Sequence, residues 1–232
     1  LELQPVQSDE PYADGFGWEV SVSLEIPKDW ESGVYMLQFM TGFGVKEIPF
    51  VVRQPDSGAD ILWVVSDATF QAYNPTGGKS SYNYQSTDRV RSSRLSLDRP
   101  FATDGTGSFL LRSRHFLAWL DREGIAVDFC GQQDVVDNPA MLKKYKCVLR
   151  VGHDEYWSME ELVALTDFWR AGGNVAFFSG NNVYWRIRYE DAGRTLVCYK
   201  DEASWPTGMT AKEARDPVAG KQPELETALF VN

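Results

Sequence analysis

The stretch that decides the fold is Cys147-Val148-Leu149-Arg150-Val151-Gly152-His153-Asp154-Glu155-Tyr156-Trp157. Its first part is largely apolar, and at Gly152 it gives way to a histidine and two carboxylates. A short apolar run that ends in this way is typical of a buried strand with a site at its carboxyl end. The pattern also fits a strand followed by a polar cap for the next helix, without any chemistry.

Three similar apolar runs accompany this one and alternate with helical patterns. Strands are predicted over Ile61–Val65, Ile125–Phe129, Cys147–Val151 and Val175–Phe178, and helices over Ser108–Glu123, Pro139–Tyr145 and Ser158–Gly172. The last helix opens with a capping box, in which a serine is followed three residues later by a glutamate. Strands that alternate with helices along a chain indicate a parallel α/β sheet with flanking helices.

Polar side chains follow all four predicted strands. They are Asp67, Gln132–Asp134, His153–Glu155 and Asn181. Because the carboxyl ends of parallel strands meet at one edge of the sheet, we expect these side chains to gather at one site.

The beginning of the chain shows a different pattern. Apolar and polar residues alternate from Trp18 to Ile26, which predicts a half-buried antiparallel strand, and further strands are predicted over Val34–Met40 and Ile48–Val52. We interpret residues 1–53 as the last strands of a β-sandwich-like domain and residues 54–232 as the α/β domain. Because the chain opens at Leu1 in the middle of this pattern, we expect it to be a fragment of a larger protein.

The connection from Asp67 to Gly107 is far longer than the roughly two to six residues usual within an α/β unit. It contains Tyr73, Tyr82 and Tyr84, and this aromatic content argues against disorder. A long ordered connection at the functional edge of a sheet predicts a lid or a covering for the site.

Composition excludes some partners. The 232 residues carry a net charge of -10, which repels phosphate backbones and anionic lipid, so neither nucleic acid nor membrane is an expected partner. No apolar run approaches the roughly 18 residues of a membrane span. The chain has three cysteines, Cys130, Cys147 and Cys198, and no C-x-x-C spacing. An odd number of cysteines without this spacing favours reduced thiols in a cytoplasmic protein.

The residues leave several chemistries open. The sequence contains neither a G-x-S-x-G nucleophile elbow nor a phosphate-binding loop. Asp154 and Glu155 are adjacent, point in different directions and make a poor acid–base pair for a glycosidase. Cys130 ends the second strand, so a glutaminase-type pair with His153 stays open. The other possibility is a metal site, because Glu155 and tyrosines such as Tyr73 are hard anionic donors that suit ferric iron.

Several motifs stand in a fixed order along the chain. They are Thr69-Phe70-Gln71-Ala72-Tyr73-Asn74-Pro75 with Gly77-Gly78-Lys79-Ser80, then Val151-Gly152-His153-Asp154-Glu155-Tyr156-Trp157, then Ala171-Gly172-Gly173-Asn174-Val175-Ala176-Phe177-Phe178-Ser179-Gly180-Asn181, and finally Arg215-Asp216-Pro217 with Pro223-Glu224. Together they resemble the N,N-dimethylformamidase large (beta) subunit family over most of residues 30–232. The resemblance implies a glutaminase-like α/β domain, of the class I glutamine amidotransferase-like and flavodoxin-like kind.

The resemblance also implies a mononuclear Fe(III) centre held by two tyrosines and one glutamate. Carried over by motif, Glu155 and Tyr73 are two of these ligands, and Tyr35 is the third, with Tyr82 as its rival. His153 and Asn181 would position water or substrate, and Glu155 or His153 would handle protons.

The activity implied by the resemblance is metal-assisted hydrolysis of a small amide such as N,N-dimethylformamide. The family also implies a small second subunit and a homo-oligomer. Two alternatives stay open on the residues themselves: a non-catalytic α/β binding module that uses the long loop, and a cysteine-dependent glutaminase-like enzyme.

Overall fold

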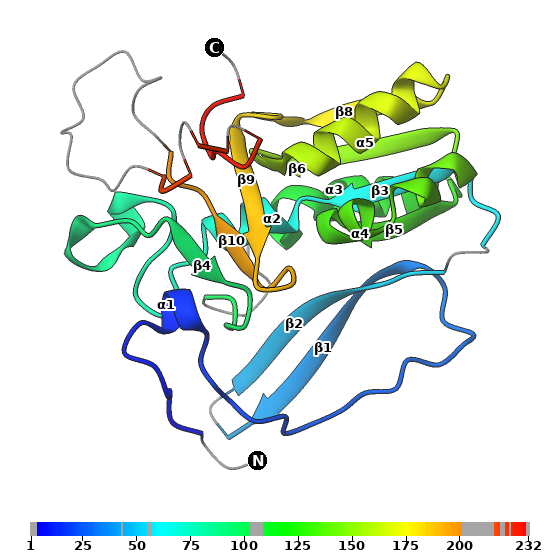
Figure 1. Ribbon diagram of the computed structural model, residues 1–232. Coiled ribbons are helices and arrows are strands. Elements are labelled where there is room, and N and C mark those ends of the chain that lie inside the picture. Colours follow the sequence, from blue (N-terminus) through cyan, green and yellow to red (C-terminus); the bar gives the residue numbers. More distant parts are fainter. Residues whose placement is uncertain are drawn as a thin grey trace.

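The computed structural model describes residues 4–42, 44–54, 57–102, 109–200, 216–218, 221–222 and 224–230. Its centre is a parallel sheet with the strand order β5-β3-β6-β8 (Figure 1). These strands are β3 (Ile61–Val65), β5 (Val127–Gly131), β6 (Cys147–His153) and β8 (Asn174–Gly180). The prediction of a parallel sheet with flanking helices is confirmed. Its assignment to the glutamine amidotransferase-like, flavodoxin-like class stays a prediction.

The helices connect and cover this sheet. They are α2 (Asp67–Ala72), α3 (Phe109–Arg122), α4 (Gln132–Asp137), the 3-10 helix η3 (Pro139–Lys144) and α5 (Met159–Arg170). The backbone N–H of Glu161 donates to Oγ of Ser158 at 3.1 Å, which is one half of the capping box predicted for α5. The Glu161 carboxylate binds Arg150 and Gln132 instead of the N-cap backbone. Ser108, where the sequence predicts the start of α3, lies outside the described residues. None of the helices in the described part of the chain is both long enough and apolar enough to cross a bilayer.

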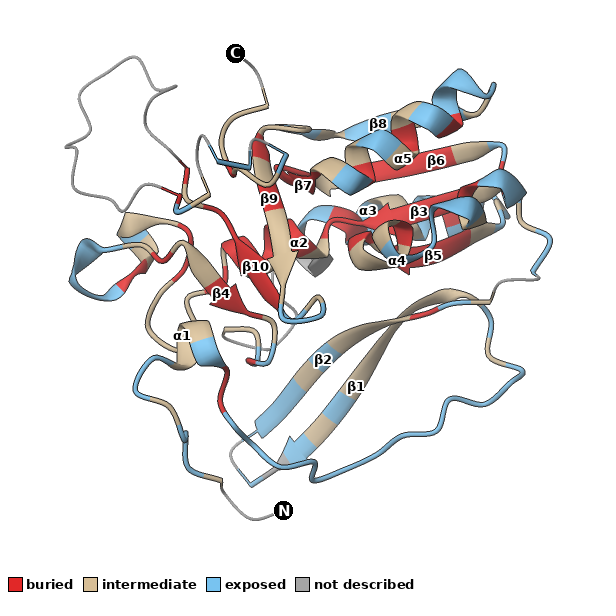
Figure 2. Cartoon of the chain, viewed as in Figure 1, coloured by how far each residue is buried: buried red, intermediate tan, exposed pale blue. Residues whose placement is uncertain are grey.

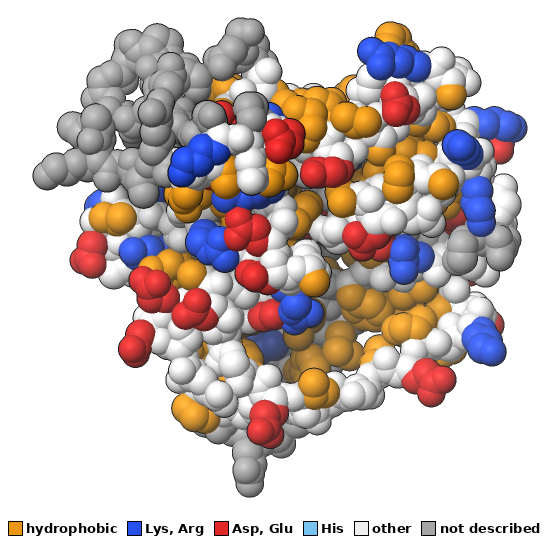
Figure 3. All heavy atoms as spheres, viewed as in Figure 1, with side chains coloured by type: hydrophobic (Ala, Val, Ile, Leu, Met, Phe, Trp, Pro, Cys, Tyr) orange, Lys and Arg blue, Asp and Glu red, His pale blue; other side chains and the backbone are white. Residues whose placement is uncertain are grey.

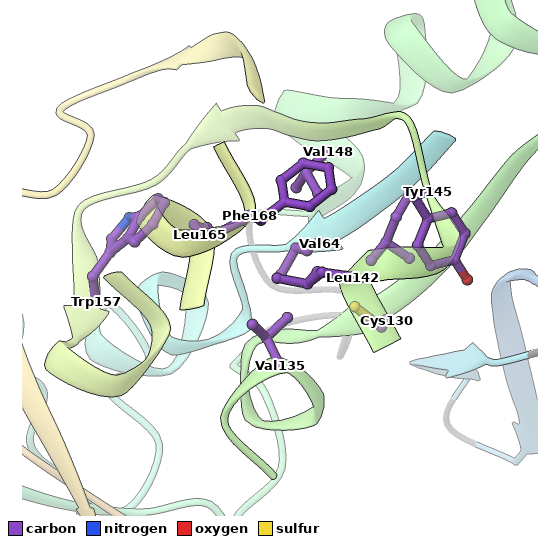
Figure 4. Close-up of a cluster of buried hydrophobic side chains, with 10 residues drawn as sticks. Val64, Cys130, Val135, Leu142, Tyr145, Val148, Trp157, Leu165 and Phe168 are labelled. Atoms are coloured by element: carbon purple, nitrogen blue, oxygen red, sulfur yellow. The ribbon is translucent and has the colours of Figure 1, made fainter. Parts of the chain in front are cut away.

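Hydrophobic cores lie on both faces of the sheet. Leu62 and Val64 of β3 pack with Val135 of α4 and Phe168 of α5 (Figure 4). The intervening β3 residues pack into the other core with the buried ends of α3 and β5; these are Trp63, Val65, Leu120 and Phe129. Figure 2 shows that the central strands of this sheet are largely buried, whereas many residues of the edge strand β8 are exposed. Burial on both faces explains why β3 is an unbroken apolar run.

A second sheet, which no pattern in the sequence predicts, lies beside the parallel one. Its strands are β4 (Arg94–Ser96), β7 (Tyr156–Ser158), β9 (Trp185–Glu190) and β10 (Thr195–Val197), in the order β4-β10-β9-β7. Only Asp154 and Glu155 separate β6 of the first sheet from β7 of the second. The segment singled out in the sequence is therefore the crossing point between the two sheets.

The amino-terminal region forms a hairpin of β1 (Gly33–Thr41) and β2 (Gly44–Val52), preceded by a short helix α1 (Pro11–Asp14). The backbone N–H of Phe129 donates to Oγ of Ser32 at 2.7 Å, which ties the hairpin to β5. These two antiparallel strands confirm the predictions for this part of the chain. The β-sandwich and the division into two domains stay predictions.

The strand predicted from Trp18 to Ile26 is wrong. This segment has no strand, and its alternating apolar side chains are exposed, with Val20 at 83%. Alternation of apolar and polar residues shows only that a segment would have one apolar face if it were extended. A strand forms only where a neighbour takes its backbone hydrogen bonds, and no strand in the described part of the chain lies alongside this segment.

Candidate functional site

Glu155 is the centre of a cluster of polar side chains at the crossing point between the sheets. Its Oε2 accepts a hydrogen bond from the hydroxyl of Tyr73 and its Oε1 accepts one from the hydroxyl of Tyr82, each at 2.7 Å. The two tyrosine rings pack against each other with their centroids 4.3 Å apart. The backbone N–H of Glu155 donates to Oγ1 of Thr69 on α2 at 3.0 Å, which fixes the carboxylate relative to Tyr73 at the end of the same helix.

His153, the last residue of β6, completes this cluster. Its Nε2 lies 3.0 Å from Oε2 of Glu155 and 3.1 Å from the hydroxyl of Tyr73. The side chains of both His153 and Glu155 are largely shielded, with 15% and 5% of their surfaces exposed. Three of the residues selected from the sequence, Tyr73, His153 and Glu155, therefore lie within hydrogen-bonding distance of one another.

The protons of the cluster lie on the phenols. Burial alone would raise the pKa of Glu155, but the hydrogen bonds from His153, Tyr82 and Tyr73 outweigh it and hold that pKa below its usual value. Burial, together with the neighbouring Glu155 carboxylate, raises the pKa of both Tyr73 and Tyr82 above the ordinary phenol value. Without a cation the site is therefore one carboxylate between two phenols.

Lys200 supplies a buried positive charge beside the cluster. Its Nζ lies 3.6 Å from the ring centroid of Tyr82 and donates to the carbonyl oxygen of Ser81 at 3.1 Å. The residue is only 4% exposed, and its charge contributes to the lowered pKa of Glu155. No pattern in the sequence singles out Lys200, because a single lysine after β10 belongs to no recognisable motif.

Tyr35 does not join the cluster. Its hydroxyl donates to the carbonyl oxygen of Glu31 at 3.0 Å, and its ring stacks on Trp30 with the centroids 4.5 Å apart. The expectation that Tyr35 lies beside Tyr73 is therefore not met, and its rival Tyr82 takes that place. The reason is the alternation of side chains along β1, because Val34 packs against the core beside the sheet and Tyr35 therefore lies on the opposite face of the hairpin.

Asn181 lies at the same edge of the sheet but makes no contact with the cluster. The β6–β8 register pairs His153 with Gly180, so Asn181 follows immediately after this edge. Its side chain is exposed and takes part in no hydrogen bond among the described residues. Any role of Asn181 would therefore concern a molecule that arrives from solvent.

The long loop after α2, described to residue 102, carries Tyr82 to the site. It contains the 3-10 helices η1 (Asn83–Gln85) and η2 (Thr87–Arg89). The buried guanidinium of Arg99 holds it by donating to the carbonyl oxygens of Gln71, Asn74 and Ser96 at 2.8, 2.7 and 2.8 Å. The loop thus covers the site, as predicted, although residues 103–107 of the predicted lid lie outside the described ones.

Asp154 points away from Glu155 and serves the fold. Its carboxylate pairs with the fully buried guanidinium of Arg150, which also donates to Oε1 of Glu161 at 2.6 Å. Ser66 donates to Oδ1 of Asp154 at 2.7 Å. Because the two adjacent carboxylates face different partners, they do not form a glycosidase-like pair.

Cys130 packs in the hydrophobic core between Val64, Val135 and Leu142 (Figure 4). Burial raises the pKa of its thiol well above the ordinary value, which makes it a poor nucleophile. His153 bonds to Tyr73 and Glu155 instead, so the glutaminase-type pair is not assembled. Cys147 and Cys198 are free thiols as well.

The donor set restricts the ways in which a metal could bind. Within the described ranges, no group of three His, Cys, Asp or Glu side chains could hold a metal ion. A metal at Glu155 would therefore need a phenol oxygen, from Tyr73 or Tyr82, as a further ligand beside His153, or both phenol oxygens without it.

Comparison with known proteins agrees with the motifs. Residues 2–227 match the family described as N,N-dimethylformamidase beta subunit-like, C-terminal. The N,N-dimethylformamidase beta subunits of Alcaligenes sp and Paracoccus aminophilus are 32% and 29% identical to this chain over 119 residues. The matched segment is 50% of this chain and 15% of each relative, so the match spans a small part of the relatives' length. Of the tail motif, Arg215 and Pro223 lie outside the described residues. Since the family match covers nearly all of its length, the chain belongs to the N,N-dimethylformamidase beta subunit-like family.

Proposed function

We propose that this chain provides the metal-holding site of a hydrolase that cleaves small amides of the N,N-dimethylformamide kind. The observation that carries the proposal is the convergence of Tyr73 and Tyr82 on the two oxygens of one buried carboxylate, Glu155. The names of the two relatives supply the substrate class, and their description as beta subunits supports a second kind of subunit in the assembly.

The oxygens of this site fit a ferric ion by charge and by hardness. Loss of both phenol protons would leave three anionic groups, Tyr73, Tyr82 and Glu155, whose charges balance a trivalent cation. Hard anionic oxygens prefer such an ion to softer metals. A phenol whose pKa is already raised by burial releases its proton only to a strongly acidic cation, which favours Fe(III) over Mg²⁺. Iron bound there would act as a Lewis acid on the amide carbonyl and on water.

The protein groups around the oxygens have separate roles in this proposal. His153 holds or moves a proton at Nε2, the atom that bonds to both Glu155 and Tyr73. Lys200 keeps the Tyr82 ring in place and favours negative charge on the neighbouring oxygens. Asn181, exposed at the sheet edge, is placed to meet the substrate from the solvent side.

An amide-hydrolysis assay separates this proposal from the cysteine enzyme and the binding module. The full-length protein, with any second subunit, should release amine from N,N-dimethylformamide, and Glu155→Gln should abolish this release. Glu160→Gln, which changes an exposed carboxylate on α5, is the matched control and should keep full activity. Thiol alkylation should leave the activity intact. Activity that survives Glu155→Gln but disappears on alkylation would overturn the proposal.

A further inference from the structure

A cavity of about 340 Å³ separates the β1–β2 hairpin from the carboxyl ends of β3 and β5. Three phenylalanines line it, Phe50 from the hairpin, Phe70 from α2 and Phe101 from the long loop, together with Asp67, Asp134 and Gly131. Figure 3 shows hydrophobic side chains gathered in the hollow between the hairpin and the sheet. The cavity thus combines aromatic walls with two carboxylates.

The Asp134 carboxylate forms an ion pair with an arginine, whereas the Asp67 carboxylate forms none among the described residues. Asp134 accepts a hydrogen bond from the backbone N–H of Gly131 at 2.9 Å and pairs with Arg53 at 2.8 Å. Oδ1 of Asp67 accepts the backbone N–H groups of Ala68 and Gln132 at 2.9 and 3.3 Å. Among the described residues nothing donates to Oδ2 of Asp67, and no cationic side chain forms an ion pair with this carboxylate.

Gly131 leaves the space that Oδ2 of Asp67 occupies. A Cβ atom on Gly131 would come within 2.7 Å of that oxygen, so any side chain there would displace the Asp67 carboxylate. Burial raises the pKa of Asp67 to about 6. The group is therefore ionised at neutral pH, and its charge, which is partly buried and only acted on from a distance by Arg150, is costly without a paired cation.

We propose that this cavity binds a small alkylammonium ion. The N–H groups of the ion donate to Oδ2 of Asp67, and its alkyl groups and positive charge pack against the rings of Phe50, Phe70 and Phe101. A cation over aromatic faces is favourable, and more so where water is excluded. A neutral alkyl compound of the same size would leave the Asp67 charge uncompensated.

The cavity and the Glu155 cluster share α2 as a wall. Asp67 and Phe70 line the cavity from this helix, whereas Tyr73 at its end reaches Glu155. Hydrolysis of N,N-dimethylformamide breaks the C–N bond, adds hydroxyl to the carbonyl carbon and a proton to nitrogen, and the amine takes up a second proton from the acid formed. The product is a dimethylammonium ion. Its identification as the occupant rests on the proposed function, whereas the binding of an alkylammonium ion does not.

Titration of the full-length protein with dimethylammonium chloride tests the proposal, with 2-propanol as the neutral compound of similar size. Binding is followed by calorimetry and by the NMR shifts of the methyl groups of Val34, Val51 and Val65, which also line the cavity. We expect saturable binding of the ammonium ion only, weakened about tenfold or more by Asp67→Asn because a charge-assisted hydrogen bond is lost.

Further variants keep the result interpretable. Phe50→Leu, on the hairpin, should weaken binding several-fold even if Asp67→Asn fails to fold. Asp60→Asn changes a carboxylate on the surface and should have no effect. Glu155→Gln should also bind the ammonium ion normally, so that loss of hydrolysis and loss of this site are distinguished. Absence of saturable binding, or unchanged affinity in both Asp67→Asn and Phe50→Leu, would overturn the proposal.

Discussion

The hydroxyl of Tyr82 donates to Oε1 of Glu155 at 2.7 Å across 73 positions of the sequence. Tyr82 lies on the long loop after α2, and Glu155 lies between the two sheets. The contact therefore depends on the loop being folded back over the sheet edge. It also adds a third oxygen-bearing side chain to Tyr73 and Glu155 at the proposed metal site.

Replacing Tyr82 by phenylalanine should remove one of the proposed ligands and little else. We expect Tyr82→Phe to lose most of its iron and the visible tyrosinate-to-iron absorption, as measured by metal analysis and spectroscopy. Tyr84→Phe is the matched control, because Tyr84 is 60% exposed and its ring only packs beside Tyr82. Tyr35→Phe should also keep the iron. Iron retained in Tyr82→Phe but lost in Tyr35→Phe would show that the ligand assignment is wrong.

Lys200 should influence the iron-binding properties of Tyr82, because its ammonium group lies over the Tyr82 ring. In Lys200→Met the phenolate of Tyr82 would lose a nearby positive charge, so we expect the iron absorption band to move to longer wavelength. We expect iron affinity to rise, because replacing two phenol protons by a trivalent cation adds positive charge beside Lys200. Lys79→Met removes another lysine that faces a ring, that of Tyr12, and should change neither property. An unshifted band in Lys200→Met would contradict this role.

Arg150 should be critical for stability. It is fully buried between Asp154 and Glu161, so Arg150→Met leaves two carboxylates without their cation. We expect the free energy of unfolding to fall by about 3–5 kcal/mol, measured by urea denaturation. Arg170→Met, at a side chain that is 70% exposed, should change it by less than about 0.5 kcal/mol. Similar effects of the two substitutions would mean that the buried network contributes little.

Asp67 should make stability depend on pH. Burial raises its pKa from 3.8 to about 6, so between these values the folded protein keeps a proton that the unfolded chain has released. Stability should therefore fall as pH rises through this window, by at most about 3 kcal/mol, and level off above it. Urea denaturation of wild type and Asp67→Asn from pH 4 to 8 measures this difference. Parallel pH curves for the two proteins would rule out the raised pKa.

Sequence patterns predicted the parallel sheet because its central strands, β3 and β6, are buried on both faces. Such strands are continuous apolar runs, and the polar residues that follow β6 stand out against them. His153 and Glu155 were found in this way, and the structure places both at one site with Tyr73.

The other parts of the fold depend on contacts between residues far apart in the sequence, which the local pattern of apolar and polar residues does not predict. The second sheet contains strands of only three residues, β4, β7 and β10, which are too short to show alternation. The sequence does not decide between Tyr82 and Tyr35 as the second tyrosine, because the path of the loop that carries Tyr82 is set by hydrogen bonds from Arg99 to backbone carbonyl groups. Conversely, the alternation from Trp18 to Ile26 predicted a strand that has no neighbour to pair with.

Metal analysis combined with visible spectroscopy of the purified full-length protein tests the central claim most directly. The convergence of Tyr73, Tyr82 and Glu155 predicts about one iron per chain and a tyrosinate-to-iron band that disappears in Glu155→Gln. A protein that hydrolyses N,N-dimethylformamide at full rate while free of iron, after reconstitution has been attempted with and without oxygen, would contradict it.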